Sequence, residues 1–197
     1  MVTSSPSETR CIQCTLVGDM AIGKTSIIKA YTDRTNCKPP PGTVFDNYAG
    51  TSKYIDQEFT VSVFDCSSKP DHASIRLFAY KDSDVFVLCY SVMDRDSFYH
   101  IKSKWLPEIT SIMGKRVKLV LVATQTDLRD SIDLDQDIPV SKTEGHDLAD
   151  DIGAFSFIEC SSSDQDCVHC IFEDVVQCSL KQKKKKHSIV QRIFGTK

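Results

Sequence analysis

Apolar and polar positions follow two different periods along this chain. Continuous apolar runs, typical of buried parallel strands, occur at Ile12–Val17, Val85–Tyr90 and Val117–Ala123. Phe59–Phe64 alternates apolar and polar residues, which predicts a half-exposed strand, and Phe155–Ile158 is a further short strand. Helical spacing of apolar residues predicts helices at Lys24–Tyr31, Asp96–Met113, Glu144–Ile152 and Cys167–Lys181. Strands that alternate with helices predict an α/β domain with a mostly parallel central sheet and helices on both faces.

The composition is that of one globular domain with tails. The chain has 197 residues, of which 41% are apolar and 26% charged, and these values are ordinary for a globular protein. We expect a flexible N-terminal extension at residues 1–10, a domain at 11–180 and a basic tail at 181–197. The apolar runs are too short to span a bilayer, and residues 1–10 contain no apolar segment typical of a secretory signal. We therefore expect a cytoplasmic, monomeric protein.

Charge is divided unevenly between the domain and the tail. From Lys181 onward there are seven basic and no acidic residues, which leaves a net charge of −10 on the rest of the chain. This asymmetry indicates either that Lys181–Lys186 meets an anionic membrane surface or that the tail is simply solvated. Each Lys near such a surface contributes about 1 kcal/mol. We therefore keep reversible attachment to the cytosolic face of the plasma membrane or of endomembranes as an expectation, and we expect no nucleic-acid partner.

The nine cysteines indicate reduced thiols, because no secretory signal precedes them. Two CxxC pairs, Cys11/Cys14 and Cys167/Cys170, are weak zinc candidates, since CxxC alone lacks flanking ligands. Cys11 and Cys14 fall in a strand, where a spacing of three places them on opposite faces. Cys167 and Cys170 fall in an amphipathic helix, and we interpret them as ordinary buried small hydrophobes.

The strongest signal is the segment Gly18-Asp19-Met20-Ala21-Ile22-Gly23-Lys24-Thr25. It matches G-x-x-x-x-G-K-[ST] in full and lies between a predicted strand and a predicted helix. In such a loop, backbone N–H groups surround phosphate oxygens at the N-terminus of a helix. Lys24 is then placed to reach the β and γ phosphates, and the Thr25 hydroxyl to bind Mg²⁺. The motif predicts a nucleoside triphosphate without specifying the base.

A second motif selects the base. Thr124-Gln125-Thr126-Asp127 follows a central strand, and ligands bind at the carboxyl ends of such strands. The Asp127 carboxylate can accept hydrogen bonds from both guanine N1–H and the exocyclic amine, a pairing that adenine cannot offer.

From about Ile12 to Leu180, the chain resembles a Rho-family small GTPase. Besides the two motifs above, the landmarks are Thr43–Tyr48 as switch I, Asp65 at the start of switch II, Glu159–Ser162 as the last base-contacting loop, Lys104-Trp105-x-Pro107-Glu108 and Asp127–Asp130. Phe64 and Gln125 are more similar to the cell-division-control subgroup than to the Rac subgroup.

The resemblance implies a P-loop small GTPase fold (a G domain) that binds GTP or GDP with Mg²⁺. By this resemblance Thr25 and Thr43 ligate Mg²⁺, and Asp65 holds it through water. Rho-type effector proteins are expected to read Val44, Phe45, Asp46, Asn47 and Tyr48 once the γ-phosphate orders the switches. The residues expected to bind the nucleotide are Gly18, Asp19, Met20, Ala21, Ile22, Gly23, Lys24, Thr25, Ser26, Thr43, Asp65, Thr124, Gln125, Asp127, Ser161 and Ser162.

Three departures from the family fall at its hydrolytic centre. Met20 stands where the family needs glycine, so that a catalytic glutamine and an arginine finger can approach. Ser68 and Lys69 stand where the family has glycine and that glutamine, which orients the attacking water. A lysine ammonium can donate but not accept a hydrogen bond. We therefore expect no intact catalytic residue, hydrolysis near zero and little stimulation by an activating protein.

Further departures concern nucleotide retention and attachment. Asn36 stands at the position of an aromatic residue that stacks on guanine, and residues 39–42 replace a tyrosine near the γ-phosphate, so we expect rapid self-exchange. The acidic segment at 130–137 is shorter than the Rho insert helix. No cysteine stands four residues from the end, so we expect no prenylation. Cys178 is either an acylation site or, as we prefer, a buried helix cysteine.

These observations predict a signalling switch that is mainly GTP-bound and acts in actin organisation or membrane traffic. The alternatives are a slow but genuine GTP hydrolase and a nucleotide-free scaffold. A P-loop kinase that uses ATP is disfavoured by Asp127 and by the lack of a segment that resembles an acceptor-binding lid.

Overall fold

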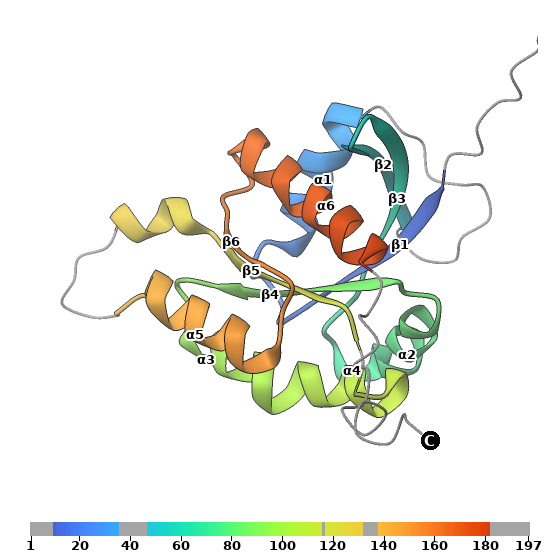
Figure 1. Ribbon diagram of the computed structural model, residues 1–197. Helices are drawn as coiled ribbons and strands as arrows, with labels where there is room; N and C mark the ends of the chain where they lie inside the picture. Colours follow the sequence, from blue (N-terminus) through green and yellow to red (C-terminus); the bar gives the residue numbers. More distant parts are fainter. Residues whose placement is uncertain (1–9, 36–46, 116, 132–137, 182–197) are drawn as a thin grey trace, which may run out of the picture.

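A six-stranded sheet forms the centre of the computed structural model, which describes residues 10–35, 47–115, 117–131 and 138–181 (Figure 1). The strand order is β2-β3-β1-β4-β5-β6; the β2–β3 pair is antiparallel and the other neighbouring pairs are parallel. The strands are β1 (Cys11–Val17), β2 (Asn47–Tyr54), β3 (Gln57–Asp65), β4 (Val85–Ser91), β5 (Leu119–Thr124) and β6 (Phe157–Glu159).

Helices cover both faces of the sheet. The helices α1 and α6 pack on one face, and α2, α3, α4 and α5 pack on the other (Figure 1). The α-helices are α1 (Lys24–Thr35), α2 (Ala73–Lys81), α3 (Arg95–His100), α4 (Leu106–Met113), α5 (Lys142–Ile152) and α6 (Gln165–Leu180). Short 3-10 helices are η1 (Pro70–His72) and η3 (Thr126–Ser131), and a π-helical turn, η2 (Ile101–Trp105), joins α3 to α4. The predicted α/β class with a mostly parallel sheet is confirmed.

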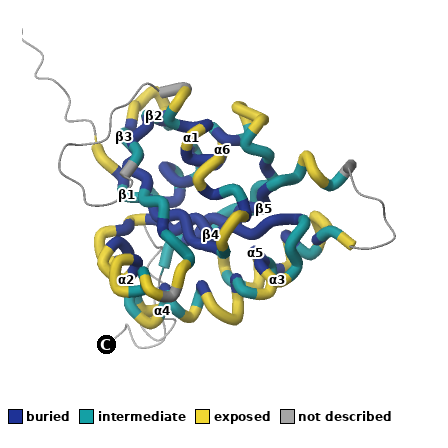
Figure 2. The backbone as a smooth tube through the Cα atoms, turned by 180° about the vertical axis from the view of Figure 1, so that it is seen from behind, coloured by how far each residue is buried: buried dark blue, intermediate teal, exposed yellow. Residues whose placement is uncertain are grey.

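Burial is deepest along the central strands. Every residue of β4 and β5 is buried, as continuous apolar runs predict (Figure 2). The prediction of a half-exposed strand at Phe59–Phe64 is wrong at its middle, because Val61, Ser62 and Val63 are all buried. The reason is that helices cover both faces of the sheet there: Val61 and Val63 belong to the core beneath α1 and α6, and Phe64 packs into the opposite core.

Several boundaries differ from the sequence-based expectations. The helix expected at Asp96–Met113 is divided by the π-helical turn η2, and the strand expected from Val117 begins at Leu119. The strand β2 and the helix α2 were not predicted. The interpretation of Cys170 as a buried hydrophobe is wrong, since the residue is exposed, whereas Cys178 is buried as preferred. The buried stripe of α6 is formed instead by Val168, Ile171, Phe172, Val175, Val176 and Cys178.

The sheet register brings the carboxyl ends of neighbouring strands to one edge. Leu16 pairs with Asp65, Ser91 with Thr124, and Ala123 with Glu159. The phosphate loop follows β1, Ser68 and Lys69 follow β3, Gln125 and Asp127 follow β5, and Ser161 and Ser162 follow β6. Ligand sites of open α/β sheets lie outside this edge, so the topology gathers the predicted site residues at one place.

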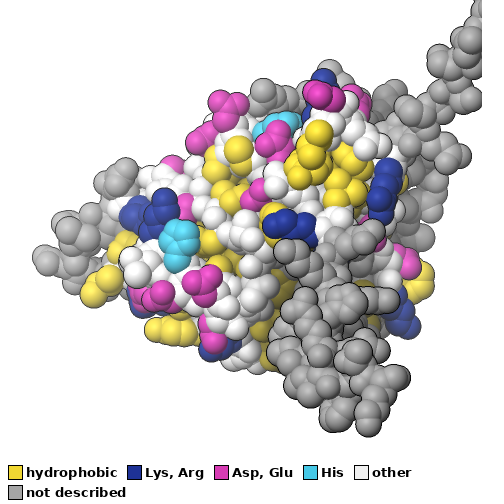
Figure 3. Space-filling view, viewed as in Figure 1, with side chains coloured by type: hydrophobic (Ala, Val, Ile, Leu, Met, Phe, Trp, Pro, Cys, Tyr) yellow, Lys and Arg dark blue, Asp and Glu magenta, His cyan; other side chains and the backbone are white. Residues whose placement is uncertain are grey.

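Some predicted features lie outside the described residues. These are Asn36, residues 39–42, Thr43, Val44, Phe45, Asp46, the acidic segment at 132–137, and the tail at 182–197. Within the described ranges, no helix combines the length and apolar character that crossing a membrane requires. Figure 3 shows acidic and basic side chains interspersed over the face that carries α5 and α6.

Candidate nucleotide-binding site

The loop between β1 and α1 has the backbone conformation that a phosphate loop requires. Gly18 lies so close to β4 that a Cβ there would be 2.2 Å from the Cys89 carbonyl oxygen. Gly23 has φ +93°, a region that L side chains rarely adopt. Ala21 has φ +62°, an uncommon conformation that is typical of functional loops. These positions curl the loop back over the start of α1.

The Lys24 side chain lies inside the curl of this loop. It is only 7% exposed, and its Nζ donates hydrogen bonds to the Gly18 carbonyl at 2.9 Å and to the Asp19 carbonyl. Burial lowers the pKa of the Lys24 ammonium, although nearby acidic groups, including Asp65 and Asp19, oppose this effect. Among the described residues, the hydrogen-bond partners of this ammonium are neutral carbonyls, so a bound anion would add charge compensation at a buried cation.

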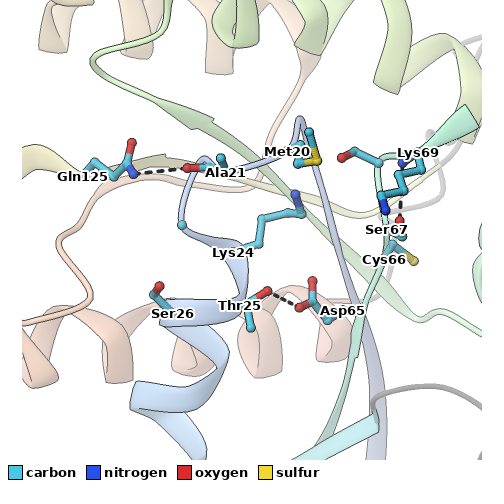
Figure 4. Close-up of a pocket in the computed structure, with 12 residues that line it drawn as sticks. Met20, Ala21, Lys24, Thr25, Ser26, Asp65, Cys66, Ser67, Lys69 and Gln125 are labelled. Carbon is cyan, nitrogen blue, oxygen red and sulfur yellow. Dashed lines mark hydrogen bonds between the residues drawn. The ribbon is translucent and has the colours of Figure 1, made fainter.

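Thr25 and Asp65 meet at the floor of the same cavity. The Thr25 hydroxyl donates a hydrogen bond to Asp65 Oδ2 (Figure 4). Thr25 is the second residue of α1, and Asp65 is the last residue of β3. Hydroxyl and carboxylate oxygens are the ligands that Mg²⁺ prefers, so these residues fit their expected roles, Thr25 as a direct ligand and Asp65 through water. The other expected ligand, Thr43, lies outside the described residues. We call Lys24, Thr25 and Asp65 the phosphate wall.

The three substituted positions lie together on another side of the cavity. The cavity has a volume of about 430 Å³, and Met20, Ser68 and Lys69 line it together with the phosphate wall. Figure 4 places Met20 and Lys69 near each other, with Lys24 between them and Thr25. The Met20 side chain is 67% exposed. We call Met20, Ser68 and Lys69 the substituted wall.

A buried arginine, which the sequence reasoning missed, holds the backbone on both sides of Ser68. Arg76 of α2 donates to the Ser67 carbonyl at 2.9 Å and to the Lys69 carbonyl at 2.7 Å. Its other nitrogens form a bidentate pair with Glu108 of α4 at 3.0 Å each, and the Tyr80 hydroxyl donates to Glu108 at 2.8 Å. Burial would raise the pKa of the Glu108 carboxyl, but the bonds from Arg76 and Tyr80 outweigh it and lower that pKa. We call this set the Arg76 clamp.

Asp19 fixes the outer side of the phosphate loop. His100 Nδ1 lies 2.5 Å from Asp19 Oδ2, Trp105 Nε1 donates to Oδ1 at 2.8 Å, and Lys104 Nζ lies 3.6 Å away. Burial opposes ionisation, but the hydrogen bonds from His100 and Trp105 prevail and lower the pKa of Asp19. The carboxylate therefore points toward the α3–α4 region, and its backbone carbonyl faces Lys24.

The segment after β5 joins the phosphate loop to the expected base site. Gln125 Nε2 donates to the Ala21 carbonyl at 3.3 Å, and its Oε1 accepts from the Ser91 hydroxyl at 2.6 Å. Gln125 lines the cavity. Thr124 is buried, and its hydroxyl lies 2.9 Å from the Tyr90 carbonyl oxygen. Thr124 is therefore a support beneath the site.

Asp127, Ser161 and Ser162 are at the same sheet edge but are not among the residues that line the 430 Å³ cavity. Asp127 is exposed at the start of η3. The Ser161 hydroxyl is occupied by Ser163, whose Oγ is 2.7 Å away. These residues thus form a second part of the predicted site, beside the phosphate part rather than within it.

An ion pair joins the two predicted base loops. Arg129 NH2 donates to Glu159 Oε1 at 2.6 Å and to the Val140 carbonyl at 2.9 Å. The sequence offered both residues only as family landmarks, without this contact. The pair fixes the end of β6 relative to η3, and so positions the Asp127 and Ser161 loops relative to each other.

The remaining predicted site residues are distributed as follows. Ser26 is exposed at the cavity, and Ile22 is buried beneath the loop. Of the effector residues, Asn47 and Tyr48 begin the edge strand β2, where Tyr48 is half-buried against the core. Among the described residues, no group of three or more His, Cys, Asp or Glu side chains could hold a metal, which leaves the CxxC zinc reading without support there.

A comparison with protein families agrees with this geometry. The model of the Ras family matches residues 13–181. The chain therefore belongs to the Ras family of small GTPases, and its fold is the G domain of that family. A protein of this family is a GTP-binding switch that binds guanine nucleotide, typically with Mg²⁺, and engages effector proteins. The buried Lys24 ammonium and the adjoining Thr25 and Asp65 oxygens fit both ligands.

Proposed function

We propose that the chain is a Rho-type molecular switch that binds GTP, hydrolyses it very slowly and remains mainly GTP-bound. The observation that carries this proposal is the side-by-side placement of Met20, Ser68 and Lys69 on one side of a cavity whose phosphate wall has the residues that binding requires. Binding chemistry and hydrolytic chemistry use different walls, so one can be lost while the other is kept.

The substituted wall lacks a group that can orient a water molecule for attack. Water positioning needs an acceptor for a water proton together with a donor, and the Lys69 ammonium supplies donors alone. Met20 adds a flexible, largely exposed side chain at the entrance where an activating residue would approach. The same three residues also line an adjoining cleft of about 330 Å³, together with Asp19, Asp94 and Lys104. The residues of the phosphate wall are not part of this cleft's lining. Access from this side is therefore bordered by Met20 and two lysines rather than by a glycine surface.

The Arg76 clamp gives this arrangement a fixed backbone. Arg76 is 4% exposed and binds the carbonyls on both sides of Ser68. A Lys69 whose backbone is held in place presents its side chain to the cavity steadily. This supports a defined substituted wall rather than a loop that adopts the family geometry transiently.

Rapid nucleotide exchange is the second part of the proposal. It rests on the sequence alone, namely on Asn36 and on residues 39–42. Loss of one stacking residue removes about 1–3 kcal/mol of base affinity. In a GTP-rich cytosol, fast release followed by GTP rebinding loads the switch without an exchange factor.

The proposed output is binding of Rho-type effectors through Val44–Tyr48, in actin organisation or membrane traffic. The strand β2 supports this in a general way, because it is the edge strand of the described sheet. Lys181–Lys186 would hold the switch at an anionic membrane surface.

Single-turnover hydrolysis tests the proposal. The full chain is loaded with γ-³²P-GTP, and phosphate release is followed without rebinding. We expect a rate at least about 10²-fold below that of an ordinary Rho GTPase, because misplacement of a reacting group alone has an effect of this size. A rate equal to that of an ordinary Rho GTPase would replace the proposal with a working hydrolase.

A further inference from the structure

We propose that Cys160 and Cys167 are a peroxide-sensitive thiol pair whose disulfide alters the guanine-contacting loop. The chemical part of this proposal stands on the thiol geometry alone. The effect on nucleotide release rests on the proposed function, because it requires the loop to contact guanine.

The two cysteines enclose the loop that is predicted to contact the base. Cys160 follows β6, and Cys167 lies in the first turn of α6. Between them are Ser161 and Ser162, two of the predicted nucleotide-binding residues. A bond between the two sulfurs would therefore close a ring around the base loop itself.

Contacts in the structure bring the two thiols together. Cys167 Sγ donates to the Glu159 carbonyl at 3.1 Å, and Cys160 Sγ lies 3.3 Å from the Ser161 carbonyl oxygen. Both sulfurs thus contact carbonyl oxygens of the same short backbone segment, Glu159–Ser161. The two thiols also lie close enough to shift each other's pKa.

Reactivity differs between the two thiols. The neighbouring Cys160 thiol lowers the pKa of the Cys167 thiol, although burial and Asp164 oppose this effect. Cys167 in turn, together with burial, raises the pKa of Cys160. Cys167 is half-buried near the N-terminus of α6, whereas Cys160 is 1% exposed. An accessible thiol with a lowered pKa and a protected partner is the arrangement of a peroxide-reactive cysteine and its resolving cysteine.

The other described cysteines lack this combination. Burial raises the pKa of Cys66 and Cys89 to about 12 and that of Cys178 to about 11. Cys170 lies one turn after Cys167 and is exposed, but slight burial and the Glu173 carboxylate raise its pKa. Cys170 is therefore a matched control on the same helix.

The reaction balances with hydrogen peroxide as the oxidant. The Cys167 sulfur attacks one peroxide oxygen, so that an S–O bond forms, the O–O bond breaks and the second oxygen leaves as water after taking up a proton. The Cys160 sulfur then attacks Cys167, so that an S–S bond forms, the S–O bond breaks and a second water leaves with the Cys160 proton. The two thiols lose two electrons and two protons, and the peroxide is reduced.

The disulfide must move the loop. An S–S bond is about 2.05 Å long, so the sulfurs have to come closer than two unbonded thiols. Oxidation also removes the Cys167 S–H donor from the Glu159 carbonyl. The Arg129–Glu159 ion pair and the Asp164 cap on Cys167 N, at 3.0 Å, hold the two ends of the segment. The displacement therefore falls on Ser161 and Ser162.

Peptide mapping tests the thiol pair. The full chain is treated with H₂O₂, the remaining thiols are alkylated, and non-reduced peptides are identified by mass spectrometry. We expect a Cys160–Cys167 crosslink, and in Cys160→Ser we expect dimedone to trap a sulfenic acid on Cys167. Labelling of Cys167 no faster than that of Cys170, or a crosslink that joins other cysteines, would overturn the pair. Because Cys160 is buried, Cys167→Ser serves as a second variant, which must lose the crosslink.

Nucleotide release tests the regulatory part. We expect H₂O₂ to accelerate release of a fluorescent GDP analogue about fivefold, the effect of losing about one hydrogen bond. The change should reverse with dithiothreitol, be absent in Cys167→Ser and persist in Cys170→Ser. A crosslink with unchanged release would overturn the regulatory part. A protein that binds no nucleotide would instead overturn the proposed function, and the mapping would still decide the thiol pair.

Discussion

The phosphate wall and the substituted wall border one cavity but follow different rules. In the phosphate wall, Lys24, Thr25 and Asp65 are the residues that the family motif specifies. Lys24 donates a hydrogen bond to the backbone of the phosphate loop, and Thr25 donates one to Asp65. In the substituted wall, Met20, Ser68 and Lys69 differ from the residues expected by resemblance to Rho GTPases. Arg76 holds the backbone on both sides of Ser68 through the Ser67 and Lys69 carbonyls. If the proposed function is correct, this difference separates nucleotide binding from nucleotide hydrolysis in one cavity.

Restoring the substituted wall should produce the largest change. In the triple variant Met20→Gly, Ser68→Gly, Lys69→Gln, we expect single-turnover hydrolysis to rise about 10²-fold, because a water-orienting group and the space for it return. Phosphate release from preloaded protein measures this rate. Lys115→Gln, a matched charge removal outside the cavity, should leave the rate unchanged. An unaltered rate in the triple variant would mean that these three residues are not the cause of slow hydrolysis.

Removing the central cation of the phosphate wall should weaken binding next most strongly. In Lys24→Met, which keeps the apolar stem, we expect affinity for a fluorescent GTP analogue to fall about 30-fold, because a hydrogen bond between charged groups contributes about 2 kcal/mol. Equilibrium titration with Mg²⁺ measures the affinity. Lys69→Met makes the same change on the other wall and should alter affinity less than about threefold. Equal losses in the two variants would contradict the division of roles.

The Arg76 clamp should contribute to stability in a pH-dependent way. We expect Glu108→Gln to lower the free energy of unfolding at pH 7 by about 2 kcal/mol, less than for a fully buried pair because the Glu108 side chain is 22% exposed. The folded-state pKa of Glu108 is lowered, so its contribution is complete above the unfolded-state pKa and is lost as pH falls through the folded-state value. Urea unfolding of both proteins between pH 7 and pH 3 measures this effect, and the difference between them should shrink toward low pH. A difference that is constant with pH would exclude the ion pair as its cause.

The contact between the base segment and the phosphate loop should have the smallest effect. In Gln125→Ala, we expect about fivefold faster nucleotide release, since the neutral bonds to Ala21 and Ser91 contribute about 1 kcal/mol. Stopped-flow release of the fluorescent analogue measures the rate. Gln177→Ala on α6, away from the cavity, provides the control, and a response of the same size there would indicate a general loss of stability.

Sequence patterns predicted the central parts of the fold because burial on both faces leaves an unambiguous signal. The apolar runs at β1, β4 and β5 are continuous, and the phosphate loop is defined by a local motif between a strand and a helix. The strand β2 was missed because Asn47–Tyr54 mixes polar residues with Gly50, and its strand character depends on pairing with β3. The helix α2 was missed because its long exposed side chains, such as Phe78, blur the helical pattern.

Contacts between distant segments account for what the sequence could not predict at the site. The Arg76 clamp joins residues 32 positions apart, and the Arg129–Glu159 pair joins residues 30 apart. The exposure of Cys170 depends on which side of α6 faces the sheet. None of these follows from local spacing, because each depends on how the helices dock on the sheet.

The identity of the nucleotide on freshly purified, full-length protein tests the central claim most directly. The protein is denatured, and the released nucleotide is separated by anion-exchange chromatography and quantified against protein. The account predicts mainly GTP, because the phosphate wall binds and the substituted wall does not hydrolyse. Mainly GDP would contradict it, since the cavity would then be hydrolysing the nucleotide that it binds.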